Sequence, residues 1–120
     1  MRETKSTNPE LVQLIRFLKK QSREKQANIW LDVAEYLAKP NSQRVAVNLS
    51  RINRHTQKRD MIVVPGKVLG AGTLNHPVTV AAFGASKKAK EKLAAARAKY
   101  LSIPELVKKN PKGAKVKIIG

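Results

Sequence analysis

Apolar residues follow a helical repeat in the first third of the chain and a strand-like pattern after residue 44. The first predicted helix begins at Asn8-Pro9-Glu10, where asparagine can cap, proline suits the first turn, and the acid faces the positive end of the helix dipole. The second spans about Ala27 to Ala38 and ends before Pro40. Their apolar faces recur every three or four residues: Leu11, Leu14, Ile15 and Leu18, then Trp30, Val33, Ala34 and Leu37. These segments predict an N-terminal helical hairpin.

Beyond residue 44 the chain divides into short β-rich segments separated by glycine, proline and asparagine. This punctuation predicts strands at 45–47, 61–64, 67–69, 78–83 and, near the end of the chain, 115–119. Turns are predicted at Pro65-Gly66 and at residues 74–77. The second part of the chain is therefore expected to form a sheet of short strands.

Three further helices are predicted among these strands. A short one after the first strand places Leu49 and Ile52 on an apolar side, and its basic side comprises Arg51, Arg54 and Lys58. Ser86 can cap a longer helix that runs to about Lys99, with a core stripe of Ala89, Leu93, Ala96 and Tyr100. A capping box at residues 102–105 begins a last short helix, which ends at residues 110–113. Together the elements indicate a mixed α/β fold.

A length of 120 residues is sufficient for one domain with a buried core. We assign residues 1–39 to an N-terminal helical extension and residues 40–120 to the mixed α/β core. The chain has no cysteine, which excludes disulfides and thiol chemistry. No apolar run approaches the ~20 residues that span a bilayer, and the N-terminus lacks the apolar segment of a secretion signal. A cytoplasmic location suits these features.

Charge is distributed unevenly. The chain carries a formal net charge of +17, and after Tyr36 there are 18 Lys and Arg against the three acids Asp60, Glu91 and Glu105. Residues 61–90 contain no acid. Charge of one sign at this density repels itself unless a partner compensates it. The sequence therefore predicts a polyanionic partner.

Two basic or glycine-rich features each permit two interpretations. Lys87 and Lys88 lie in the first turn of a predicted helix, where they either reach solvent or bind a phosphate together with the free backbone N–H groups. The segment 65–72 contains Gly66, Gly70 and Gly72, and it either lets a phosphate approach the backbone or forms turns and a bulge between strands. Its spacing matches neither a phosphate-binding loop nor a dinucleotide fingerprint.

Catalytic and metal chemistry find little support in the residues. Neither His55 nor His76 has a Cys, Asp or Glu at metal-ligand spacing, and the acids of the basic region are scattered. We expect no metal, no cofactor and no enzymatic activity. The five aromatic residues fall mostly on apolar faces, so base stacking is not expected to dominate. This favours binding to phosphates and ribose of structured RNA or to duplex DNA.

Two stretches carry a resemblance to a known family: residues 40–53, which include Val47-Asn48-Leu49-Ser50-Arg51, and residues 64–74, which include Pro65-Gly66-Lys67-Val68-Leu69-Gly70. The chain resembles the archaeal and eukaryotic large-subunit ribosomal protein family L-eighteen-e over essentially its whole length. Residues 78–90 also resemble part of the bacterial protein L-fifteen, a distant relative. The resemblance implies an irregular ββα superhelix-like core after the helical extension, with ribosomal RNA and neighbouring ribosomal proteins as partners.

We therefore predict a non-catalytic constituent of the large ribosomal subunit that neutralises rRNA phosphates and holds RNA helices in place. No membrane and no small-molecule substrate are expected. The alternatives are a free nucleic-acid-binding module, such as a chromatin or RNA-chaperone protein, and, less favoured, a small RNA-acting enzyme. The predicted RNA-binding residues are Arg16, Lys20, Arg23, Arg44, Arg51, Arg54, His55, Lys58, Lys67, Lys87, Lys88 and Arg97.

Overall fold

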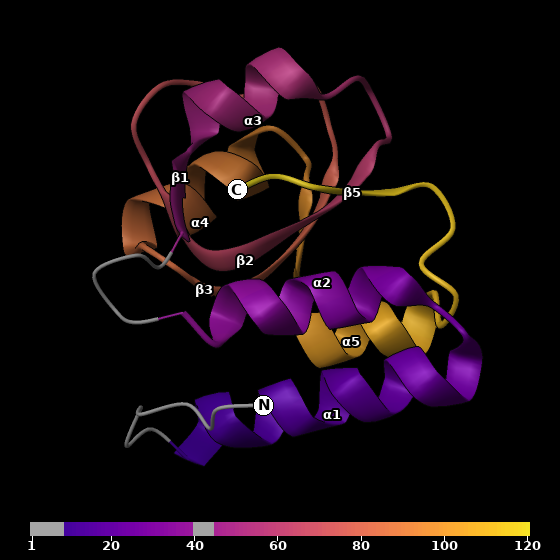
Figure 1. Cartoon of the computed structure of the whole chain (residues 1–120). Helices are drawn as coiled ribbons and strands as arrows, with labels where there is room; N and C mark the ends of the chain where they lie inside the picture. Colours follow the sequence, from indigo (N-terminus) through magenta and orange to yellow (C-terminus); the bar gives the residue numbers. More distant parts are fainter. Residues whose placement is uncertain (1–8, 40–44) are drawn as a thin grey trace.

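Helices cover both faces of a parallel sheet in the computed structural model, which describes residues 9–39 and 45–120 (Figure 1). One helical layer contains α1 (Pro9–Lys25), α2 (Asn28–Leu37) and α5 (Ile103–Lys109). The opposite layer contains α3 (Leu49–His55) and α4 (Lys87–Ala95). Between them lie β1 (Val45–Asn48), β2 (Met61–Leu69), β3 (Thr79–Ala85), β4 (Lys99–Ser102) and β5 (Val116–Ile118). The mixed α/β class and the leading helical hairpin are thereby confirmed.

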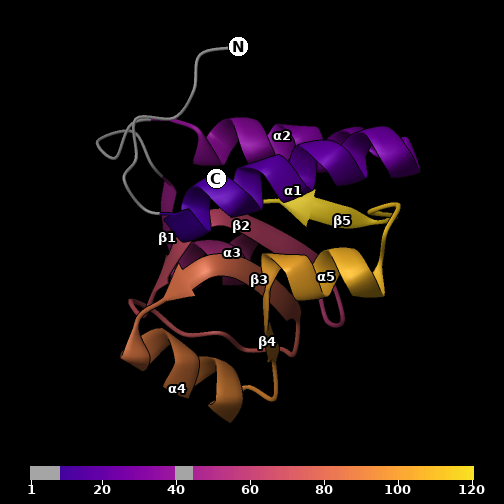
Figure 2. The same ribbon diagram turned by 90° about the horizontal axis from the view of Figure 1, so that it is seen from below.

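All pairings among the five strands are parallel, and β2 is the central strand. One side of β2 pairs with β3, which in turn pairs with β4. Its other side is shared, because β5 pairs with residues 61–63 and β1 pairs with residues 66–69. Parallel strands need covering elements on both faces, which the two helical layers provide (Figure 2).

Alternate residues of β2 and β3 pack into two separate apolar clusters. Val63 and Ala81 face the layer of α1, α2 and α5, where Trp30 is fully buried. Ile62, Val64, Val80 and Ala82 face the layer of α3 and α4. The two-residue period of a strand thus builds both cores from one sequence segment. The Trp30 indole N–H also donates to the carbonyl oxygen of Pro111 at 2.7 Å, which fixes the segment between α5 and β5.

Local signals at the helix ends are largely confirmed. Helix α1 begins at Pro9, while its predicted cap Asn8 lies outside the described residues. Ser86 caps α4 by accepting from the Ala89 N–H at 3.1 Å. Ser102 and Glu105 form the predicted capping box of α5, in which each side chain accepts from the other residue's backbone N–H.

The predicted turn at Pro65-Gly66 is wrong, because β2 continues through both residues. The strand instead shifts register between Val64 and Lys67 relative to β3, so of the predicted turns and bulge only the bulge is present here. A Cβ at Gly66 would lie against the backbone carbonyl of Val45, only 2.9 Å from its carbon. Glycine is needed here because β1 approaches the bulge closely, and this contact between distant residues leaves no turn signature in the local sequence.

The predicted helix through Lys99 is also wrong, because α4 ends at Ala95. Arg97 adopts a left-handed conformation with φ 60°, which turns the chain back to the sheet. Residues 99–102 then form β4, where Tyr100 pairs with Val80 of β3. Helix propensity extends the alanine-rich pattern in isolation, but pairing with β3 provides tertiary contacts that override it. Ala96 and Tyr100 accordingly lie outside the helix and are only half-buried.

Candidate nucleic-acid interface

The predicted RNA-binding residues that the structure describes lie on three separate surfaces. We call the side where β1 to β4 end the carboxyl edge (residues 48–51, 67–72 and 84–88). The side where β2 to β5 begin is the amino edge (residues 54–61, 76–79, 97–99 and 115–117). The third surface is the solvent face of α1. Arg44 lies outside the described residues.

A glycine loop at residues 70–72 lies between α3 and α4 at the carboxyl edge. The backbone of Ala71 pairs on both sides, since its N–H donates to Asn48 Oδ1 at 3.3 Å and its carbonyl accepts from the Ser50 N–H at 3.1 Å. From α4, Lys92 Nζ donates to the carbonyl oxygens of Gly70 and Gly72, both at 2.7 Å. The loop is therefore held in one conformation by residues of both helices.

Both glycines of this loop are required by close packing. A Cβ at Gly70 would lie 2.9 Å from the Lys88 Cβ, and one at Gly72 would lie 2.5 Å from the Ser50 Cβ. Gly72 also has φ 85°, a conformation that glycine adopts without steric cost. The two glycines thus bring the N-terminal ends of α3 and α4 close to the end of β2.

Exposed cations surround the loop. Lys67 extends from β2 beside Gly84, and Lys87 and Lys88 occupy the first turn of α4. Their ammonium groups make no ion pair within the described part of the chain. Arg51 differs, because its Nη2 donates to the carbonyl oxygen of Gly120 at 2.8 Å. The carboxyl edge therefore combines a rigid backbone with lysines that make no ion pair. Residues 61–90 contain no acid, and the first one that follows is Glu91, one turn after Lys87 in α4.

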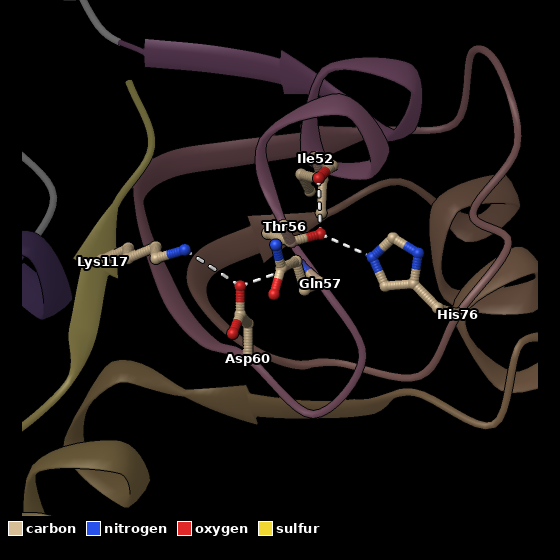
Figure 3. Close-up of polar contacts among 6 residues, drawn as sticks. All are labelled: Ile52, Thr56, Gln57, Asp60, His76 and Lys117. Atoms are coloured by element: carbon tan, nitrogen blue, oxygen red, sulfur yellow. Dashed lines mark hydrogen bonds and ion pairs between the residues drawn. The ribbon is translucent and has the colours of Figure 1, made fainter.

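A network of polar contacts fixes the amino edge (Figure 3). The Thr56 hydroxyl donates to the carbonyl oxygen of Ile52 at 2.7 Å, so the 2.8 Å contact with His76 Nε2 requires the imidazole to donate. Asp60 Oδ2 accepts from the Gln57 N–H at 2.8 Å and from Lys117 Nζ at 3.0 Å. Those two interactions, in that order, lower the pKa of Asp60 below its ordinary value.

Four predicted residues lie exposed at this edge: Arg54, His55, Lys58 and Arg97. The prediction that Lys58 continues the basic face of α3 is wrong, because the helix ends at His55 and Lys58 lies in the following turn. Arg97 likewise lies beyond α4 rather than on it. Three cations that the sequence patterns do not single out also reach solvent here: Arg59, Lys99 and Lys115. Their shared signal is a position just before or at the first residue of a strand.

The α1 surface carries Arg16, Lys20 and Arg23, all exposed as predicted from their offset to the apolar stripe. Figures 1 and 2 place α1 on the outside of the helical layer, on the opposite side of the sheet from α3 and α4. These cations do not converge with the sheet edges on one site. The molecule instead presents basic surfaces in several directions.

Within residues 9–39 and 45–120 no group of three or more His, Asp or Glu side chains is arranged to hold a metal ion. In the same part of the chain, none of the helices has the length and apolar character needed to cross a membrane. The carboxylates with lowered pKa, Asp60 and Glu105, are each held by a turn or a helix cap. These two carboxylates thus maintain backbone structure.

Comparison with known proteins gives consistent matches over the full length. Residues 1–120 match the family described as ribosomal protein 60S L18 and 50S L18e. The large ribosomal subunit protein eL18 of Methanococcus maripaludis is 49% identical over 119 residues, which cover 99% of each chain. The protein of the same name from Pyrobaculum aerophilum is 47% identical over 116 residues, covering 97% of this chain and 95% of the relative. That from Methanothermobacter thermautotrophicus is 44% identical, covering 99% and 98%.

Proposed function

Because the chain belongs to the family of ribosomal proteins 60S L18 and 50S L18e, we propose that it is a structural constituent of the large ribosomal subunit. It binds folded ribosomal RNA there and lies among other ribosomal proteins. The family is one of structural proteins rather than enzymes. Its physical task is to neutralise phosphates where RNA segments converge, and so to hold those segments in a fixed relative orientation.

The distribution of cations carries this proposal. Exposed lysines and arginines occupy both edges of the sheet and the solvent face of α1, around a rigid three-layer core. A protein that reads one duplex would concentrate its cations on one face, whereas three basic surfaces suit a protein surrounded by RNA. The outer face of α2 is the exception, since that helix contains no Lys or Arg and exposes Asp32 and Glu35. This face suits a protein neighbour better than RNA.

Sedimentation tests the assignment. A tagged copy of the chain, expressed in cells that contain its own ribosomes, should migrate with large subunits when lysate is separated on a low-salt sucrose gradient. Recovery at the top of the gradient, or with chromosomal DNA, would exclude the ribosomal role and favour a free nucleic-acid-binding module.

Salt dependence tests phosphate neutralisation at the carboxyl edge. The logarithm of the affinity for large-subunit rRNA should fall linearly with the logarithm of salt concentration, with a slope of about 0.7 to 0.9 per phosphate neutralised. Replacing Lys87 and Lys88 together by alanine should make this slope shallower by about one to two. Arg51→Ala is the matched comparison, because its guanidinium already donates to Gly120, and we expect a smaller change. An unchanged slope in the double variant would remove this edge from the interface.

A further inference from the structure

Three cations at the amino edge have an unfavourable backbone conformation. Arg59, Arg97 and Lys115 have φ values of 71°, 60° and 60°, in the left-handed region that L-residues rarely adopt. Each lies one or two residues before a strand: Arg59 before β2, Arg97 before β4 and Lys115 before β5. Among the described non-glycine residues only Gln26, in the connection between α1 and α2, shares this conformation.

Strand pairing brings the three positions together. Met61 pairs with Val116 of β5 on one side and with Thr79 of β3 on the other, and Thr79 pairs with Lys99 of β4. Neighbouring strands lie about 4.8 Å apart, so the strand starts form a row about 14 Å wide from β5 to β4. Backbone hydrogen bonds link these strand starts to one another. The Arg59 N–H donates to the carbonyl oxygen of Pro77 at 2.7 Å, and the Lys99 N–H donates to that of Val78 at 2.9 Å.

Glycine would be the less strained residue at all three positions. A left-handed conformation costs an L-residue more than glycine because its Cβ crowds the backbone. Elsewhere the chain uses glycine for the same purpose, since Gly72 has φ 85° and Gly113 has φ 64°. The amino edge instead retains two arginines and a lysine where a side chain is unfavourable to the local backbone. Such an outlier suggests that the side chain itself has a use.

The three side chains have no use within the described fold. All are exposed, and none makes a hydrogen bond or ion pair with residues 9–39 or 45–120. The one acid in the row, Asp60, is already compensated by Lys117 at 3.0 Å. Lys58 and Lys99 add two further exposed cations beside them. The result is a row of exposed positive charge in which the neighbouring acid, Asp60, is already paired.

We propose that Arg59, Arg97 and Lys115 form a phosphate-binding row that contacts the backbone of ribosomal RNA across the starts of β5, β2 and β4. The left-handed conformations turn the chain sharply where each strand begins, and they place one cation at each turn. RNA is favoured over an acidic protein because several cations gathered on one rigid edge, where Lys117 already pairs with the neighbouring acid Asp60, match a chain of phosphates. This inference rests on the proposed ribosomal function and adds a surface to it.

Glycine substitution separates the backbone role of these residues from their side-chain role. Arg59→Gly, Arg97→Gly and Lys115→Gly should each keep the fold or stabilise it, lowering the unfolding equilibrium constant by up to about fivefold in urea titrations. Each should also make the salt slope of rRNA binding shallower by about 0.7 to 0.9, and the triple variant by about two to three. Gln26→Gly is the matched control, because it removes the same strain without removing charge. It should leave the slope unchanged.

Further variants distinguish charge from shape. Arg97→Lys should restore the wild-type slope, whereas Arg97→Asn, which tolerates the same φ, should match Arg97→Gly. If all three glycine variants kept the wild-type salt slope of rRNA binding, the proposed phosphate-binding row would be overturned. The Lys87 and Lys88 double variant would still test the proposed function, because those lysines lie at the other edge of the sheet. Binding of polyglutamate, but not of rRNA, that depends on these three side chains would also overturn the proposal, in favour of an acidic protein partner.

Discussion

Two glycines of the same sheet should respond in opposite ways to the same added methyl group. In Gly66→Ala the new Cβ would meet the carbonyl group of Val45, whose carbon lies 2.9 Å away, and this backbone cannot rotate aside as a side chain could. Overpacking costs about 1 to 3 kcal/mol, and we expect the upper end because β1 must move away from β2. In Gly84→Ala nothing lies within 4 Å of the new Cβ. That variant should gain about 0.4 to 1 kcal/mol, because alanine restricts the unfolded chain.

The free energies of unfolding of the two variants should therefore differ by about 3 to 4 kcal/mol. Trp30, the single tryptophan, is fully buried and reports unfolding by fluorescence. With a urea m-value of about 1.5 kcal/mol/M, the two midpoints should lie about 2 to 3 M apart, with wild type between them. If the midpoints coincided, or if Gly66→Ala were the more stable variant, the close approach of β1 to the bulge would be refuted.

Three other substitutions test local features. Ser102→Ala removes the cap of α5 and should lower the free energy of unfolding by about 1 kcal/mol, as measured by thermal unfolding. Ser50→Ala retains the backbone hydrogen bond to Ala71 and should cost less. Equal losses of stability in the two variants would contradict the capping role. Lys92→Met should loosen the glycine loop by removing both bonds to its carbonyls, so amide exchange at Ala71 should accelerate; unchanged exchange would contradict this. Because folding lowers the pKa of Asp60, its carboxylate stabilises the fold above pH 3.8, and this contribution disappears as the pH falls through the lowered value. Asp60→Asn should therefore be at most about 1 kcal/mol less stable than wild type at neutral pH and equal to it in acid; a gap that persisted in acid would contradict the reasoning.

Local sequence signals predicted the elements whose cause is local. The N-terminal hairpin, the cap at Ser86 and the capping box at Ser102 depend on residues within one or two turns, and the structure confirms all three. The basic residues of α1 were also placed correctly, because an amphipathic helix determines which side chains reach solvent.

Features that depend on contacts between distant segments were not predictable in this way. The continuity of β2 through Pro65 and Gly66 depends on pairing with the distant strand β1, where Val45 lies beside Gly66. The end of α4 depends on pairing between Tyr100 and Val80. The role of Lys92 in holding the glycine loop requires α4 and the loop to be adjacent in space. The left-handed conformations of Arg59, Arg97 and Lys115 could not be predicted from residue type, because glycine is the residue that usually marks a left-handed position.

Ultraviolet cross-linking of intact large subunits, followed by mass spectrometry of this chain, tests whether both edges of the sheet contact ribosomal RNA. Nucleotide adducts are expected on peptides of both sheet edges, including Lys87, Lys88 and Arg97, and none on the outer face of α2 at Asp32 and Glu35. Adducts confined to α2, or subunits that contain the protein without any RNA cross-link at either edge, would contradict this expectation.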